Sequence, residues 1–136
     1  MSPPHAFDVA AHVGQVHVAQ AAMARELLRT ARHVLVVRRQ LDDDQAWEQW
    51  AAEHFEFGPG AAQTLSAIAE TFAAEIGEAI DLFQPGALYV LAQPGAGGAA
   101  AEAMHLARRK RVRITCELAR RLVDGTSTLD SGKSKA

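Results

Sequence analysis

Apolar residues recur every three or four positions between Asp8 and Gln40, a segment with no proline and a single glycine. This spacing is typical of an amphipathic helix, because it gathers the apolar side chains in one stripe. The stripe runs through Val13, Val16, Gln20, Met23, Leu27, Ala31, Val34 and Leu35. A helix of about 30 residues is about 45 Å long, which exceeds the needs of one small core. We therefore expect the helix 8–40 to pack against a second copy in a homodimer.

The pattern over residues 44–76 predicts two shorter helices joined by a tight turn, the outline of a helix-turn-helix. The acidic residues before the first helix offer an N-cap, and its buried face holds Trp47, Trp50, Ala51 and Phe55. Gly58, Pro59 and Gly60 suit the turn and the first helical turn after it. The inward positions of the second helix are Ala62, Leu65, Ile68, Ala69, Phe72 and Ile76. Its outward positions are Gln63, Thr64, Ser66, Ala67, Glu70, Thr71 and Glu75.

Residues 78–125 are expected to form further short helices. The stretch 86–93, "GALYVLAQ", has strand propensity, but it lies between helices and has no strand to pair with, so a short buried helix is the better interpretation. A helix over 99–111 follows, and Thr115 is a plausible N-cap for a last helix that Asp124-Gly125 ends. The pattern as a whole predicts a single all-α domain over residues 8–125. The small, polar residues 126–136 are expected to form a disordered tail.

The composition agrees with a folded helical chain. Of the 136 residues, 49% are hydrophobic and 22% are charged, and β-branched runs are scarce. No window holds the roughly 18 uninterrupted apolar residues of a membrane span, and the N-terminus lacks the order of a secretory signal. One cysteine excludes an internal disulfide. These observations lead us to expect a cytoplasmic protein without a membrane partner.

The charges are distributed unevenly, although the net charge is only −2. Five arginines lie between Arg25 and Arg39, no Lys or Arg follows before Arg108, and eleven Asp and Glu residues fill the interval. The chain is therefore basic, then acidic and then basic again. This distribution says more about possible partners than the net charge does. The candidate phosphate contacts are Arg108, Arg109, Lys110, Arg111, Arg113, Arg120 and Arg121, with Arg25, Arg29 and Arg32 as possible additions.

Two aromatic-rich segments resemble a little-characterised family of bacterial, phage- and plasmid-borne helical proteins. Its members carry W-x-x-W-x-x-x-x-F, then F-S-x-R-T-A-Q and an A-E pair, and the residues that match here are Trp47, Trp50, Phe55, Phe57, Ala62, Gln63, Ala69 and Glu70. The stretch "PGALYVLAQP" is similar to the S-A-L-Y-x-L-A-x-P segment of that family. A final I-T…A-R-x-L helix is matched by Ile114, Thr115, Ala119, Arg120 and Leu122. The resemblance covers most of residues 15–124, and it implies a helix-turn-helix core that binds DNA.

The central helix pair departs from the family at the positions that a recognition helix uses. Gly58-Pro59-Gly60-Ala61 replaces the Ser, Arg and Thr of the pattern, and Ala67 stands where a basic residue is common. Gln63, Thr64 and Ser66 could read base edges. However, residues 46–70 contain four glutamates and no cation, so a polyanion would be repelled. We therefore expect this pair to serve as a scaffold.

The sequence contains no group of residues that is typical of a catalytic site, a metal site or a phosphate-binding loop. His12 and His17 lie on different helical faces, the remaining histidines are isolated, and Cys116 has no catalytic partner. The glycines of "PGAGG" lack the context of a phosphate loop. We thus expect no catalytic residue, metal or cofactor. The sequence favours a non-enzymatic protein of phage or plasmid regulator type that binds double-stranded DNA through its basic N- and C-terminal helices. The alternative is a helical protein-interaction or dimerisation module with no nucleic-acid role.

Overall fold

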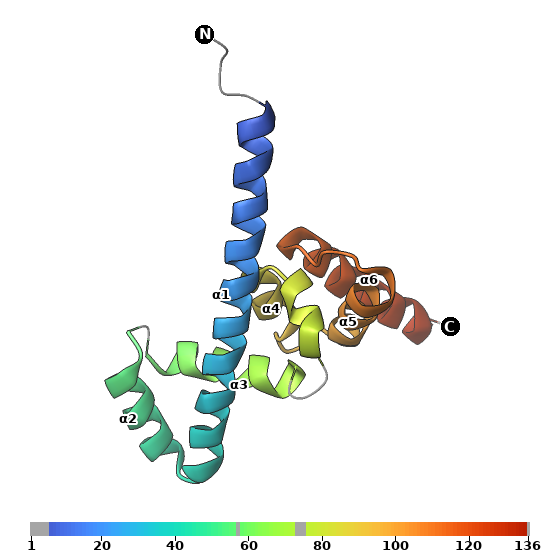
Figure 1. The fold of residues 1–136 in the computed structure, drawn as a ribbon. Coiled ribbons are helices and arrows are strands. Elements are labelled where there is room, and N and C mark those ends of the chain that lie inside the picture. The colour runs from blue at the N-terminus through green and yellow to red at the C-terminus, as the bar shows by residue number, and fades with distance from the viewer. Residues whose placement is uncertain (1–5, 57, 73–75, 136) are drawn as a thin grey trace.

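The computed structural model confirms the all-α fold (Figure 1). It describes residues 6–56, 58–72 and 76–135, and the side chains of residues 9–56, 58–72 and 76–125. The order of elements is α1 (Ala6–Gln40), α2 (Asp44–His54), α3 (Pro59–Phe72), the 3-10 helix η1 (Gly77–Leu82), α4 (Pro85–Leu91), α5 (Ala99–Lys110) and α6 (Cys116–Lys135). Phe57 and Glu75, which the sequence analysis assigned to the central helix pair, lie outside the described residues.

The long helix α1 has two halves with different surroundings. Its C-terminal half packs on α3, η1 and α4, and its buried residues there are Ala24, Leu28, Ala31, Val34 and Leu35. Its N-terminal half extends away from the other helices (Figure 1). The predicted apolar stripe is therefore buried within this chain only toward its C-terminal end, and Val13, Val16 and Met23 are exposed. Periodicity identifies the residues that share a helix face, but it does not show whether the chain covers that face.

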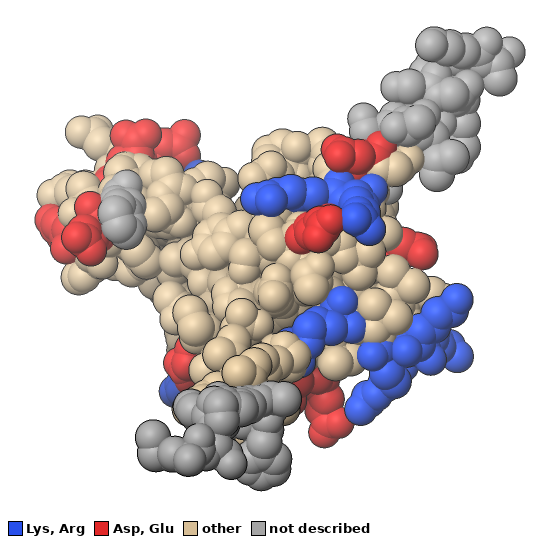
Figure 2. Space-filling model, turned by 90° about the horizontal axis from the view of Figure 1, so that it is seen from above, with Lys and Arg blue, Asp and Glu red and all other residues tan. Residues whose placement is uncertain are grey.

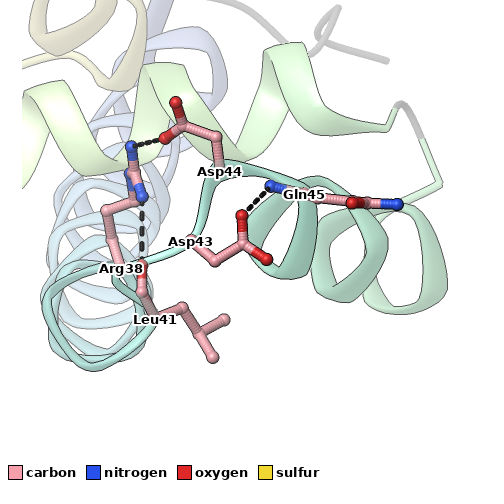
Figure 3. A network of polar contacts seen from close by, with 5 residues as sticks. All are labelled: Arg38, Leu41, Asp43, Asp44 and Gln45. Carbon is pink, nitrogen blue, oxygen red and sulfur yellow. Dashed lines mark hydrogen bonds and ion pairs between the residues drawn. The ribbon is translucent and has the colours of Figure 1, made fainter.

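A polar network fixes the corner between α1 and α2 (Figure 3). The Arg38 guanidinium donates to Oδ1 of Asp44 (2.9 Å) and to the carbonyl of Leu41 (3.3 Å). Asp43 is the N-cap of α2, and its carboxylate accepts from the backbone N–H of Gln45 (3.1 Å). A cap of this kind stabilises a helix by about 1 kcal/mol. The acidic run thus starts α2, as expected from the sequence.

Helix α3 is the central helix of the fold. It contacts α1, α2 and α4, and its buried residues are Ala62, Leu65, Ser66, Ile68, Ala69 and Phe72. Ser66 was expected to face outward, and this prediction is wrong, because helices on several sides bury more of α3 than one apolar stripe. The turn before α3 uses Gly58 at φ 77°, a left-handed conformation that favours glycine.

The C-terminal elements are joined by one short pairing of extended backbone. Phe83 and Ile114 form an isolated parallel bridge, in which Ile114 N–H donates to the Leu82 carbonyl (2.7 Å) and Gln84 N–H donates to the Ile114 carbonyl (2.9 Å). Segment 85–91 is a helix, as predicted, and it packs on α6. The hydroxyl of Thr115 caps α6 by accepting from Leu118 N–H (3.0 Å), which confirms the predicted N-cap.

The last helix is longer than the sequence analysis predicted. We expected it to end at Asp124-Gly125, but α6 runs to Lys135. A glycine inside a helix costs only about 1 kcal/mol relative to alanine, and no proline follows Gly125, so the helix is not forced to end there. Residues 126–135 of the predicted disordered tail, 126–136, belong to α6, and residue 136 lies outside the described residues. Within the described parts of the chain, no helix has the length and apolar character needed to cross a bilayer.

Candidate nucleic-acid interface

The end of α5 presents four consecutive cations, Arg108, Arg109, Lys110 and Arg111, which we call the basic turn. The opposite face of α5 is buried through Ala99, Ala100, Ala103, Met104 and Ala107. All four cations are consequently exposed. Three of them occupy the last turn, where positive charge interacts favourably with the helix dipole. The basic turn is thus held on a well-packed helix with its charges in solvent.

Arg111 adopts a backbone conformation that is unusual for a residue with a side chain. It is the C-cap of α5 at φ 55° and ψ 34°, and its N–H donates to the carbonyl of Leu106. Among the described residues other than glycine, it is the one with a positive φ. Glycine is the common residue at this helix position, and a side chain in the left-handed region costs about 1–2 kcal/mol. The charge of Arg111 is evident from the sequence, but its left-handed conformation was not predictable from it.

The remaining C-terminal cations differ in how available they are. Arg120 is exposed on α6, whereas Arg121 is engaged, since its guanidinium lies 2.6 Å from Oε1 of Glu117. Arg113 is half-buried, and its Nη1 atom is enclosed by protein without a hydrogen-bond partner. Of the seven C-terminal candidates, Arg113 therefore fits a surface phosphate contact least well.

The α1 arginines are largely committed to carboxylates. Arg25 lies 3.1 Å from Oδ1 of Asp81, and Arg29 lies 3.6 Å from Oε1 of Glu26. Arg32 is exposed. Exposed ion pairs of this kind are weak, but they lower the local positive charge. Asp81 is on η1, and no pattern in the sequence pairs it with Arg25.

Arg25 of α1 and Arg111 of the basic turn line the same depression, which we call the η1 hollow. This hollow of about 550 Å³ is lined by Arg25, Gly77, Glu78, Ile80, Asp81, Leu82 and Arg111. Arg25 and Arg111 are thus brought to the same depression. Glu78 and Asp81 share it, however, so the hollow has mixed charge and is not a continuous electropositive surface.

Figure 2 shows where the charges gather on one face of the molecule. Lys and Arg side chains collect over the side that carries α5 and α6, in separate groups with acidic side chains nearby. The end that carries α2 shows mainly Asp and Glu. The basic face of this view is therefore the C-terminal part of the fold, with the basic turn as its densest segment of sequence.

The central helix pair does not present the residues that a groove reader needs. Gln63 is exposed, but the Thr64 hydroxyl donates to the carbonyl of Gly60 (3.0 Å) within its own helix. Ser66 is 1% exposed, so it cannot reach a base edge. The expectation that α3 acts as a scaffold agrees with its central, buried position.

Other chemistry finds little support among the described residues. They contain no group of three His, Cys, Asp or Glu side chains that could hold a metal ion. Cys116 is half-buried in the first turn of α6, where its N–H donates to Oε1 of Gln84 (2.9 Å). His54 lies against Trp50, with 5.2 Å between the ring centroids.

In comparisons with known proteins, no family model, no curated protein and no solved structure matches this chain. The resemblance to phage- and plasmid-borne proteins consequently stays a prediction from the sequence.

Proposed function

We propose that this protein is a non-enzymatic, DNA-associated protein that contacts duplex phosphates through the basic turn, residues 108–111, and that it acts as a homodimer joined through α1. The observation that supports the proposal is the basic turn itself. Its four cations are exposed, and none of them forms an ion pair with a residue that the structure describes. Exposed cations that are clustered at one helix end and not paired with carboxylates are the kind of site that binds a phosphate backbone.

The side chains of the basic turn are better suited to contacts with DNA phosphates than to recognition of base edges. Guanidinium and ammonium groups bind phosphate oxygens well, and such contacts carry no direct sequence information. With Arg120 of α6 as a fifth contact, the logarithm of the affinity would fall with the logarithm of the salt concentration with a slope of about −4 to −5. We therefore expect weak sequence preference and a strong dependence on salt. A homodimer would carry two such turns, and the slope per dimer would be larger.

A second candidate function is a protein-interaction module with no nucleic-acid role. It is favoured by the ion pairs that already engage Arg25, Arg29, Arg38 and Arg121. Arginines matched by carboxylates of the same chain have little reason to bind phosphates. The proposal for DNA is accordingly restricted to the basic turn and Arg120, without the α1 arginines.

The test compares two variants that lose the same charge. In the first, Arg108, Arg109 and Lys110 are changed to alanine together; in the second, Arg29, Arg38 and Arg121 are. Affinity for a duplex of arbitrary sequence is measured at several salt concentrations on nuclease-treated protein. The first variant should lower the salt slope by about 2.7, because each phosphate contact contributes about 0.9, whereas the second should lower it by less than 1. A wild-type slope near zero would favour the interaction module, and equal slopes for the two variants would show that the basic turn is not the main phosphate-binding surface.

A further inference from the structure

The N-terminal half of α1 is exposed to solvent over residues 9–19 and carries no acidic or basic side chain there. Residues 9–24 contain no Asp, Glu, Lys or Arg. Four valines and a methionine on it are exposed, Val9 at 61%, Val13 at 46%, Val16 at 51%, Val18 at 62% and Met23 at 60%. A single helix of this kind, extending from the body as in Figure 1, is only marginally stable in water. This surface is therefore suited to a partner.

Six exposed or half-buried residues of α1 have the spacing of a coiled-coil seam. The seam consists of Val9, Val13, Val16, Gln20, Met23 and Leu27, which follow one another in steps of four and three residues. This alternation is the heptad spacing that lets two helices supercoil with their side chains interlocked. Val18 is exposed but lies on the other side of the helix. The seam is thus one defined stripe.

The seam runs into an apolar depression on the body of the same chain, which we call the Tyr89 hollow. It has a volume of about 440 Å³ and is lined by Met23, Glu26, Leu27, Thr30, Leu65, Pro85 and Tyr89. Met23 and Leu27 belong to the seam, whereas Leu65 comes from α3 and Tyr89 from α4. The exposed apolar surface therefore comprises the seam and the Tyr89 hollow, which lies beside the C-terminal end of the seam.

We infer that a second copy of this chain binds here with its α1 antiparallel, so that Val13 of each copy faces Met23 of the other and the projecting half fills the Tyr89 hollow. This inference rests on the homodimer in the proposed function and names its geometry. Val9 then faces Leu27, and Val16 faces Gln20. Every facing position in this register belongs to the seam.

The absence of charged side chains in residues 9–24 indicates which partner binds the seam. DNA or a charged protein surface would need complementary charges, and residues 9–24 offer none. A second copy presents the same uncharged stripe, so the two stripes meet without repulsion. An antiparallel pair also has the two-fold symmetry in which one patch binds an identical patch.

The register and the direction follow from burial. A shift by one heptad in one direction would set Val9 against Val34, which is 2% exposed and already packed in its own chain. A shift by one heptad in the other direction would leave Met23 and Leu27 without a seam residue opposite them. A parallel pair would set the Tyr89 hollow of one copy against that of the other, so neither would be filled.

Cysteine cross-linking of the full chain tests the geometry. Val13→Cys and Met23→Cys are each made in a Cys116→Ser background, which removes the one natural cysteine. Val13 and Met23 are about 15 Å apart along α1, whereas a disulfide needs Cα atoms within about 7 Å. In the antiparallel dimer each variant alone should stay unlinked, and an oxidised mixture of the two should yield a covalent dimer as its main product. Val18→Cys, near the two-fold axis but on the outer side, is the matched control and should not link.

Each other outcome overturns the inference in a recognisable way. If Val13→Cys links to itself, the pair is parallel, and the dimer in the proposed function survives. If the wild-type protein sediments as a monomer at about 50 µM, the dimer and the inference both fail, while the salt-slope test of the basic turn is unaffected. A stable dimer in which the mixture gives no more linkage than Val18→Cys places the interface elsewhere.

Discussion

Arg25 Nη1 lies 3.1 Å from Oδ1 of Asp81, and both side chains are about half exposed. Arg25, a candidate phosphate contact from the sequence, is thus paired with the carboxylate of Asp81, which lies more than 50 residues later in the chain. Arg111 lines the same η1 hollow. The charge balance of this hollow therefore decides whether α1 takes part in phosphate binding.

Asp81→Asn should release Arg25 toward DNA. The variant keeps the shape of the side chain and removes its charge, so the salt slope should steepen by up to about 1. An exposed ion pair contributes about 0–1 kcal/mol, so the free energy of unfolding should fall by less than 1 kcal/mol. Asp44→Asn is the matched control, because it releases Arg38 at the α1–α2 corner (Figure 3). If both variants leave the slope as in the wild type, α1 has no share in binding.

Arg111→Gly should stabilise the protein and weaken DNA binding. Glycine adopts the left-handed conformation of this C-cap without steric cost, and we expect a gain of about 1 kcal/mol in the free energy of unfolding. The lost cation should reduce the salt slope by about 0.9. Denaturant unfolding and DNA titration measure the two effects. Arg111→Ala separates them, since it removes the charge but keeps the strained backbone; a stability gain in this variant would contradict the assigned cause.

Ile114→Ala should be strongly destabilising. Ile114 is fully buried, and its backbone pairs with Leu82 and Gln84 on both sides of the Phe83 bridge. Removing such a side chain costs about 2–5 kcal/mol, measurable as a lower urea midpoint at an unchanged slope. Val36→Ala, on the exposed side of α1, should change stability by less than about 0.5 kcal/mol. Similar values for the two variants would mean that the buried Ile114 side chain contributes little to the stability of the core.

Gln63→Ala and Thr64→Ala should leave DNA affinity within about twofold of the wild type, a difference below about 0.4 kcal/mol. Gln63 is the exposed residue of the three base-reading candidates, and Thr64 is bonded to its own helix. Binding is measured at low salt on a duplex and on its scrambled sequence. A tenfold loss on either duplex would restore α3 as a reading helix and remove the scaffold assignment.

Much of the fold was predictable because it depends on local interactions. The apolar period of α1, the acidic cap of α2, the glycine turn before α3 and the Thr115 cap each act within a few residues, and the structure confirms the elements they predict. Segment 85–91 was also predictable as a helix, once the absence of a strand to pair with was weighed against its propensity. The α6 end at Asp124-Gly125 was predicted wrongly, since one glycine weakens a helix without forcing it to stop.

The sequence by itself determined the helices, their amphipathic faces and the clustering of cations at residues 108–111, because these properties follow from residue types at short spacing. Only the tertiary structure decided which faces are covered and which charges are paired. Ser66 became buried because several helices surround α3, and Val13 stayed exposed because no other element that the structure describes covers it. Arg25 met Asp81 because η1 packs against α1. Burial and ion pairing join residues far apart in the chain, and short-range patterns carry no information about such contacts.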